Sequence, residues 1–177
     1  IISVVLLKSI KSMVSLKPNE VTRKVSVLWI DFSLKTPSAS VITWFLFLFN
    51  YTVEKKNNNK NFEFSIKVPE TITHIKKLDV EKGAIASFEE FLDKISPLKI
   101  ANKLGAILIQ LPPSFTVTDF KNTENFLDNL PSGYQYAVEF RHPSWNTEGP
   151  WEMLKHYDIA AVMTDSPISD NLQFLSE

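Results

Sequence analysis

The sequence predicts an α/β fold in which parallel strands alternate with helices. Strand-like and helix-like patterns alternate from residue 61 to residue 165. The strand-to-strand spacing is regular in the last two units, and one strand is apolar almost throughout, which is typical of a strand covered on both faces. Repeated strand–helix units of this kind form a parallel sheet.

The first predicted strand and helix lie within residues 62–95. Residues 62–68, FEFSIKV, alternate apolar and polar side chains, which predicts a strand. Apolar residues then recur every three or four positions from Ala84 to Ile95, which predicts an amphipathic helix. Pro97 is expected to end this helix at Ser96, because a proline disfavours the helical conformation of the residue before it.

The second unit begins with the apolar run LGAILIQL, residues 104–111, and Pro112 ends this strand because proline cannot donate to a sheet ladder. A second helix face extends from Phe120 to Leu130. Residues 134–140, YQYAVEF, then alternate as the third strand.

Pro150 fits the first turn of a third helix, and residues 159–165, IAAVMTD, predict a fourth strand. Upstream, residues 24–30 and 41–49 read as two more strands, without a convincing helix between them. Residues 54–60 are a polar, low-complexity stretch that predicts a loop.

Composition narrows the function classes. The chain is 44% hydrophobic and 22% charged, which is typical of soluble globular proteins. It has no cysteine, so disulfides and thiolate metal sites are excluded and a cytoplasmic location is the default. Residues 61–177 carry more acidic than basic side chains, so we expect no nucleic-acid partner.

The first part of the chain differs from the rest. All 4 glycines lie after residue 82, although tight turns usually need glycine. Residues 41–49 are apolar but far shorter than the ~20 residues of a membrane helix, so no membrane association is expected. We therefore treat residues 1–60 as an aberrant N-terminal segment and residues 61–177 as the α/β portion, and the chain as a fragment.

Each predicted strand carries a polar group at or near its carboxyl end. Alternation places Glu139 and Arg141 on one face of the third strand, opposite Val138 and Phe140. Parallel α/β sheets and barrels bind ligands at these ends, so we expect the groups to converge on one mouth. They are Lys67, Gln110, Glu139, Arg141 and Asp165.

The alternative reading is structural. Buried charges are costly without partners, so Lys67 with Glu139, or Glu139 with Arg141, would neutralise each other as an ion pair under either interpretation. Agreement among four strand ends favours a functional site.

Individual side chains suggest roles. Glu139 is the first candidate for a general base or ligand, and the planar fork of Arg141 suits a phosphate or carboxylate. His142 fits an acid or base, or a loop cap before proline. Trp145 fits a stacking platform or a loop anchor. His156, in the last turn of a helix, favours the helix dipole.

No metal site is predicted, and the sequence does not identify a cofactor. Glu139, His142 and Asp165 are conceivable ligands, but no close pair has i, i+4 or H-x-H spacing. The sequence also lacks a glycine-rich phosphate loop and a nucleophile elbow.

Several motifs together resemble the YecE-like family, also called domain of unknown function 72. They are FEFSIKVPETITH (62–74), KLGAILIQLPPSF (103–115), YAVEFRHPSW (136–145) and AAVMTDSP (160–167). The resemblance covers residues 61–177 in family order and implies that they are the (β/α) barrel portion of a YecE-like domain. The family's glycine- and tryptophan-containing opening is not found in residues 1–60, and its further strands beyond TDSP are not seen.

The resemblance implies a TIM-type barrel with a pocket at the strand ends and an unassigned activity, sometimes related by analogy to sugar isomerases. The positions that match the family's pocket are Lys67, His74, Gln110, Glu139, Arg141, His142, Trp145 and Asp165. Of these, we assign Glu139, His142 and Asp165 as candidate catalytic residues. We assign Lys67, His74, Gln110, Arg141 and Trp145 as candidate substrate-binding residues, although His74 lies in a predicted loop.

Two functions remain open. The first is an enzyme that acts on a small polar metabolite, such as a sugar or sugar phosphate, with Glu139 and Asp165 in acid–base roles. The second is a non-catalytic binding module or an inactive truncated relative. The sequence gives no indication of oligomeric state.

Overall fold

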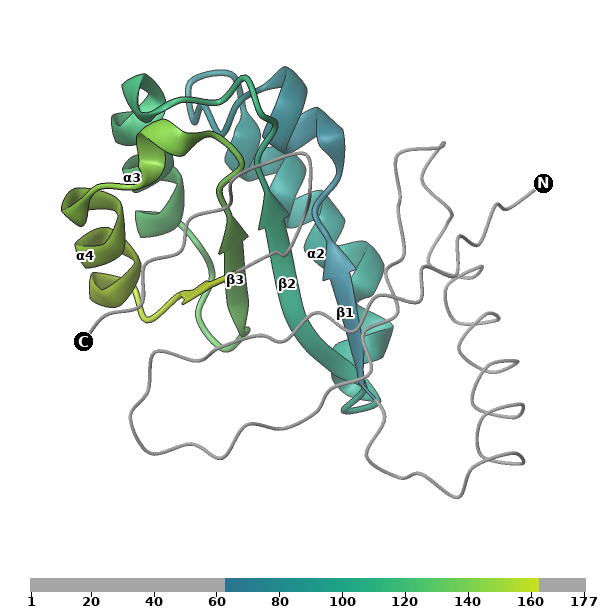
Figure 1. Ribbon diagram of the computed structural model, residues 1–177. Helices are drawn as coiled ribbons and strands as arrows, with labels where there is room; N and C mark the ends of the chain where they lie inside the picture. The colour runs from purple at the N-terminus through teal and green to yellow at the C-terminus, as the bar shows by residue number, and fades with distance from the viewer. Residues whose placement is uncertain (1–62, 163–177) are drawn as a thin grey trace, which may run out of the picture.

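The computed structural model describes residues 63–162, which form a parallel sheet with helices packed along one side (Figure 1). The sheet has four strands in the order β1-β2-β3-β4, and every neighbouring pair is parallel. The strands are β1 (Phe64–Lys67), β2 (Leu104–Gln110), β3 (Tyr136–Glu139) and β4 (Ala160–Ala161). The α/β class with strands alternating with helices is confirmed, and it is consistent with part of a TIM-type barrel.

Three helices connect the strands: α2 (Ala84–Ile100), α3 (Phe120–Asp128) and α4 (Glu148–His156). A short helical turn follows each of the first three strands, namely η1 (Thr71–Ile75), η2 (Val117–Asp119) and η3 (Pro143–Trp145). Pro150 lies in the first turn of α4, as predicted. The predicted fourth strand extends past the described residues, and the segments expected at 24–30, 41–49 and 54–60 lie outside them.

The two faces of the sheet have different neighbours. Ile66, Ile109 and Val138 belong to the main core, together with buried residues of all three helices. Leu108 and Ala137 belong to a second, smaller cluster on the other face, with Ala106 and Val162. The predicted alternation is therefore confirmed, and it assigns Gln110 and Glu139 to the face of the smaller cluster.

Helix α2 does not end at Ser96, so that prediction is wrong. The helix continues through Pro97 to Ile100. A proline inside a helix leaves the carbonyl four residues earlier without its N–H donor, and here that carbonyl belongs to Asp93. The Ser96 hydroxyl donates to the Asp93 oxygen at 2.7 Å and so replaces the missing bond.

If the Ser96 hydroxyl replaces the missing N–H of Pro97, the cost of removing it should depend on which residue occupies position 97. Ser96→Ala is expected to lower the free energy of unfolding by about 0.5–1.5 kcal/mol, the net value of one hydrogen bond. In a Pro97→Ala background, residue 97 supplies the N–H, so the same change should cost less. Urea unfolding followed by circular dichroism measures both costs, and equal costs in the two backgrounds would contradict the explanation.

The loop predicted after the first strand is instead a π-helical turn, η1, closed by a bond from the Lys76 N–H to the Thr71 oxygen at 3.0 Å. Lys77 and Leu78 follow with φ of 51° and 57°, in the left-handed region. Ile72 and Leu78 are buried, and this burial holds the turn against the core. His74 is therefore helical rather than in an open loop.

Among residues 63–162, no helix has both the length and the apolar composition that a membrane crossing requires.

Candidate functional site

Gln110 and Glu139 meet where β2 and β3 end. They are register partners across the parallel pair. The Gln110 Nε2 donates to the Glu139 Oε2 at 2.8 Å. The side chain of Glu139 is only 3% exposed. A carboxylate this deeply buried is costly unless donors surround it, and the neighbouring strand supplies one of them.

Arg141 lies two residues after Glu139, on the same side of the chain. Its Nε is 3.8 Å from the Glu139 Oε1, which is an ion pair rather than a hydrogen bond. The Arg141 side chain is 36% exposed, whereas its partner is buried. The expected pairing of Glu139 with Arg141 is confirmed, and each carboxylate oxygen therefore has a positively polarised neighbour.

Lys67 shares this face of the sheet but lies further from the carboxyl ends of the strands than Gln110 does. It is in register with Leu108, two residues before Gln110. Its Nζ is 4.0 Å from the Glu70 Oε1, and the two side chains are 17% and 48% exposed. The structure thus gathers four of the predicted polar groups on one face, Lys67, Gln110, Glu139 and Arg141.

His142 serves as a cap of the β3–α4 connection. Its backbone is extended (φ −113°, ψ 133°), so its side chain leaves on the side of Phe140 rather than of Arg141. The Ser144 N–H donates to the His142 Nδ1 at 3.1 Å, and the Ser144 Oγ lies 2.8 Å from the same nitrogen. An Nδ1 that accepts leaves the proton of the neutral ring on Nε2. The structure does not bring His142 to the Glu139 carboxylate.

Trp145 is fully buried, which fits the loop-anchor interpretation rather than a ligand platform. Its ring stacks on Phe140 with centroids 4.3 Å apart and on Phe115 at 5.7 Å. Its Nε1 donates to the Phe115 oxygen at 2.8 Å. Because no face of the ring is open to a ligand, we do not include Trp145 in the proposed site.

The remaining candidates make contacts of their own or lie outside the described residues. His74 is half-buried in η1, where its Nδ1 is 2.8 Å from the Thr73 Oγ1. His156 lies in the last turn of α4, as predicted, with its ring against Tyr157. Asp165 lies beyond residue 162, so its place relative to Glu139 stays a prediction.

Ser144 is a structural link that the sequence interpretation missed. Besides meeting His142, its Oγ accepts from the Val117 N–H at 3.0 Å. It thereby ties the connection after β2 to the connection after β3. A serine two residues after a histidine and directly after a proline is a local signal for such side-chain capping.

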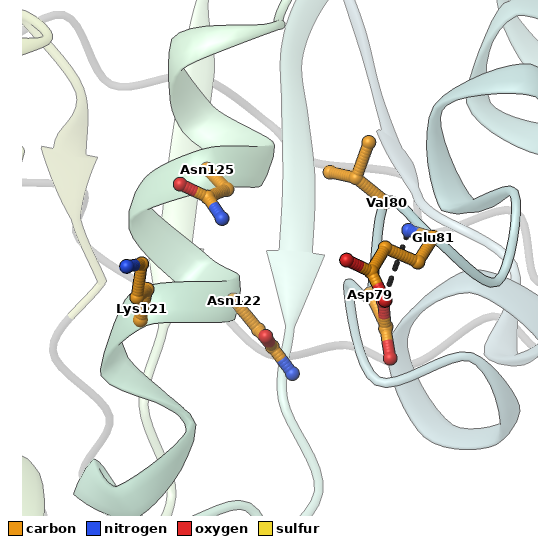
Figure 2. Close-up of a pocket in the computed structure, with 6 residues that line it drawn as sticks. All are labelled: Asp79, Val80, Glu81, Lys121, Asn122 and Asn125. Carbon is orange, nitrogen blue, oxygen red and sulfur yellow. Dashed lines mark hydrogen bonds between the residues drawn. The ribbon is translucent and has the colours of Figure 1, made fainter.

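Two surface hollows lie elsewhere. One, of about 250 Å³, lies between α3 and the Asp79–Glu81 loop. Figure 2 shows the residues that line it, with Asn122 pointing toward the loop. The Lys82 ammonium, 2.9 Å from the Asp79 Oδ2, holds the pKa of Asp79 below its usual value through a hydrogen bond. The second hollow, of about 320 Å³, lies between η1 and α2. Neither is lined by Gln110, Glu139 or Arg141.

In the part of the chain that the structure describes, no group of three or more histidine or acidic side chains is arranged so that it could hold a metal ion. The chemistry available at the ends of β2 and β3 is that of a buried carboxylate, an amide and a partly exposed guanidinium.

Comparison with known proteins identifies similar chains. Residues 52–174 match the family model described as protein of unknown function DUF72. The UPF0759 protein YecE of Escherichia coli K12 is 34% identical over 98 residues, covering 55% of this chain and 34% of YecE. This chain thus spans about a third of the length of the curated relatives it matches.

Solved structures show the same arrangement. A DUF72 family protein from Thermotoga maritima MSB8 has a TM-score of 0.59 and 27% identity, over 82% of this chain and 53% of that one. A second, from Enterococcus faecalis V583, has a TM-score of 0.54 and 21% identity, over 81% and 57% of the respective chains. The latter likeness concerns the fold alone.

Proposed function

This chain belongs to the DUF72 family of proteins of unknown function, and we propose that the carboxyl ends of its strands form a site where Glu139 exchanges a proton with a small polar metabolite. The substrate class we propose is a sugar or sugar phosphate. The observation that carries the proposal is the 3% exposed carboxylate of Glu139, in contact with Gln110 and Arg141 at the end of a parallel strand. Catalytic groups of (β/α) barrels come from these ends.

The roles within the site follow from exposure. Glu139 is shielded from water, which suits a group that acts on a bound molecule. Arg141 is more exposed and suits recognition, and Lys67 adds a second cation on the same face. Asp165, which lies beyond the described residues, stays in the proposal as a second acid–base group.

A second candidate function is binding without catalysis. It is favoured by the contacts on both carboxylate oxygens of Glu139, a hydrogen bond from Gln110 and an ion pair with Arg141. A buried carboxylate with a partner on each oxygen is also what a structural role requires. In that case the same face binds a metabolite and no proton moves.

Proton exchange distinguishes the two functions. We would incubate the chain in D₂O with a panel of sugars and sugar phosphates and follow loss of carbon-bound protons by NMR. Glu139→Gln keeps the shape but removes the base, and it is expected to slow exchange on the order of a hundredfold or more. Circular dichroism would verify that the variant is folded.

The matched control is Glu89→Gln, on the exposed side of α2, which should exchange at the parent rate. Exchange by Glu139→Gln at the parent rate would exclude the acid–base role. Metabolite binding by the parent chain without any exchange would favour the binding function.

A further inference from the structure

We propose that Arg141 receives an anionic oxygen group of the ligand, a carboxylate or a phosphate, and that Gln110 positions Arg141 by fixing Glu139. The inference rests on the proposed function, because it names the chemical class that the same site takes. It also assigns Gln110 a positioning role rather than direct ligand contact.

Arg141 has N–H donors that the described residues do not use. A guanidinium carries five N–H donors. Among residues 63–162, its ion pair with Glu139 engages only the Nε, at 3.8 Å, and no described residue accepts a hydrogen bond from it. The side chain is 36% exposed, so these donors are open to an incoming acceptor. Carboxylates and phosphates match this planar fork with two parallel bonds.

Glu139 holds Arg141 in place and is itself held by Gln110. Glu139 is 3% exposed and accepts from the Gln110 Nε2 at 2.8 Å on its other oxygen. The two residues are register partners on adjacent strands, so sheet geometry fixes their spacing. The resulting order is Gln110, Glu139, Arg141, and an amide from β2 thereby holds the carboxylate that faces the guanidinium.

The charged side chains on this face of the sheet determine which ligands it attracts. Lys67 lies on the same face, and its pair with the half-exposed Glu70 is at 4.0 Å, so solvent screens that contact. The carboxylate of Glu139 is already engaged by Gln110 and Arg141. Lys67 and Arg141 carry two positive charges on this face against the one negative charge of Glu139, and the net positive charge favours an anionic group over a cationic one.

The chain provides a clean reporter for the test, because it contains only two arginines, Arg23 and Arg141. In protein labelled with ¹⁵N-arginine, an Arg23→Lys variant assigns the two side-chain Nε–H resonances. Inorganic phosphate and acetate are then titrated separately at constant ionic strength, with chloride as the control anion. The two arms distinguish a phosphate preference from a carboxylate preference.

We expect the Arg141 resonance to shift with saturation for phosphate, acetate or both, and not for chloride. Gln110→Leu should weaken that affinity by about tenfold, the equivalent of one hydrogen bond to a charged group. Arg141→Lys, a change at a partly exposed position, removes the arginine reporter, so its phosphate and acetate affinities are measured beside those of the parent by isothermal titration calorimetry. It should weaken them at least as much and keeps the test valid if Gln110→Leu does not fold.

Two results would overturn the inference. One is an Arg141 resonance that responds equally to all three anions. The other is an anion affinity unchanged in folded Gln110→Leu. Failure of the proposed function is separate, because the loss of carbon-bound protons in D₂O does not depend on this titration. Saturable anion binding without exchange would retain the anion site and reject proton transfer by Glu139.

Discussion

Replacing Trp145 by alanine is expected to lower the free energy of unfolding by about 3–5 kcal/mol, which is typical of large buried aromatic side chains. Trp145 is fully buried. It stacks on Phe140 at the end of β3 and on Phe115 in the connection after β2, and its Nε1 bonds to the Phe115 oxygen. The change therefore opens a cavity under both connections.

The measurement is urea unfolding of Trp145→Ala beside Trp145→Phe. Phenylalanine keeps an aromatic ring but loses the indole N–H that donates at 2.8 Å to the Phe115 oxygen, so about 1 kcal/mol is expected from the lost bond, with a further loss for the smaller ring. A Trp145→Ala cost below about 1 kcal/mol would show that the ring is not a structural anchor, and would restore it as a candidate for ligand stacking.

Gln110→Leu is expected to lower the free energy of unfolding by about 1–3 kcal/mol, because the buried Glu139 carboxylate loses its amide donor. Leucine is close in size, so the lost hydrogen bond rather than a cavity accounts for the cost.

The matched control is Gln135→Leu, which changes an exposed glutamine directly before β3. We expect its cost to stay within about 0.5 kcal/mol, as for most surface substitutions. Equal costs for the two variants, measured by urea unfolding, would show that the Gln110 amide does not stabilise Glu139.

The sequence was sufficient for the parallel fold because alternation is set by strand geometry. Ile66 and Val138 lie on the helix-facing side, and Gln110 and Glu139 lie on the other, as the two-residue period requires. The meeting of Gln110 and Glu139 follows from parallel register, which brings the carboxyl ends of neighbouring strands to one edge.

What the sequence did not predict depends on compensating contacts. Pro97 is tolerated inside α2 because the Ser96 hydroxyl replaces a backbone donor. The π-helical turn that contains His74 is held by the buried Ile72 and Leu78. These contacts arise from side-chain positions that local propensity does not encode.

The sequence pattern also did not predict where the residues after Glu139 would lie. Arg141, His142 and Trp145 are close in sequence, yet only Arg141 joins the carboxylate. His142 caps the connection through Ser144, and Trp145 enters the aromatic core. Their separation is decided by backbone dihedrals and packing after the strand ends, which motif content does not specify.

A double-mutant cycle between Gln110 and Glu139 tests the central claim most directly, namely that adjacent strands join these side chains into one site. The variants are Gln110→Leu, Glu139→Met and both together, compared by urea unfolding. Since each single change leaves a partner unsatisfied and the double change removes both groups, we predict that the double variant costs at least about 1 kcal/mol less than the sum. Costs that add to within about 0.5 kcal/mol would contradict the site.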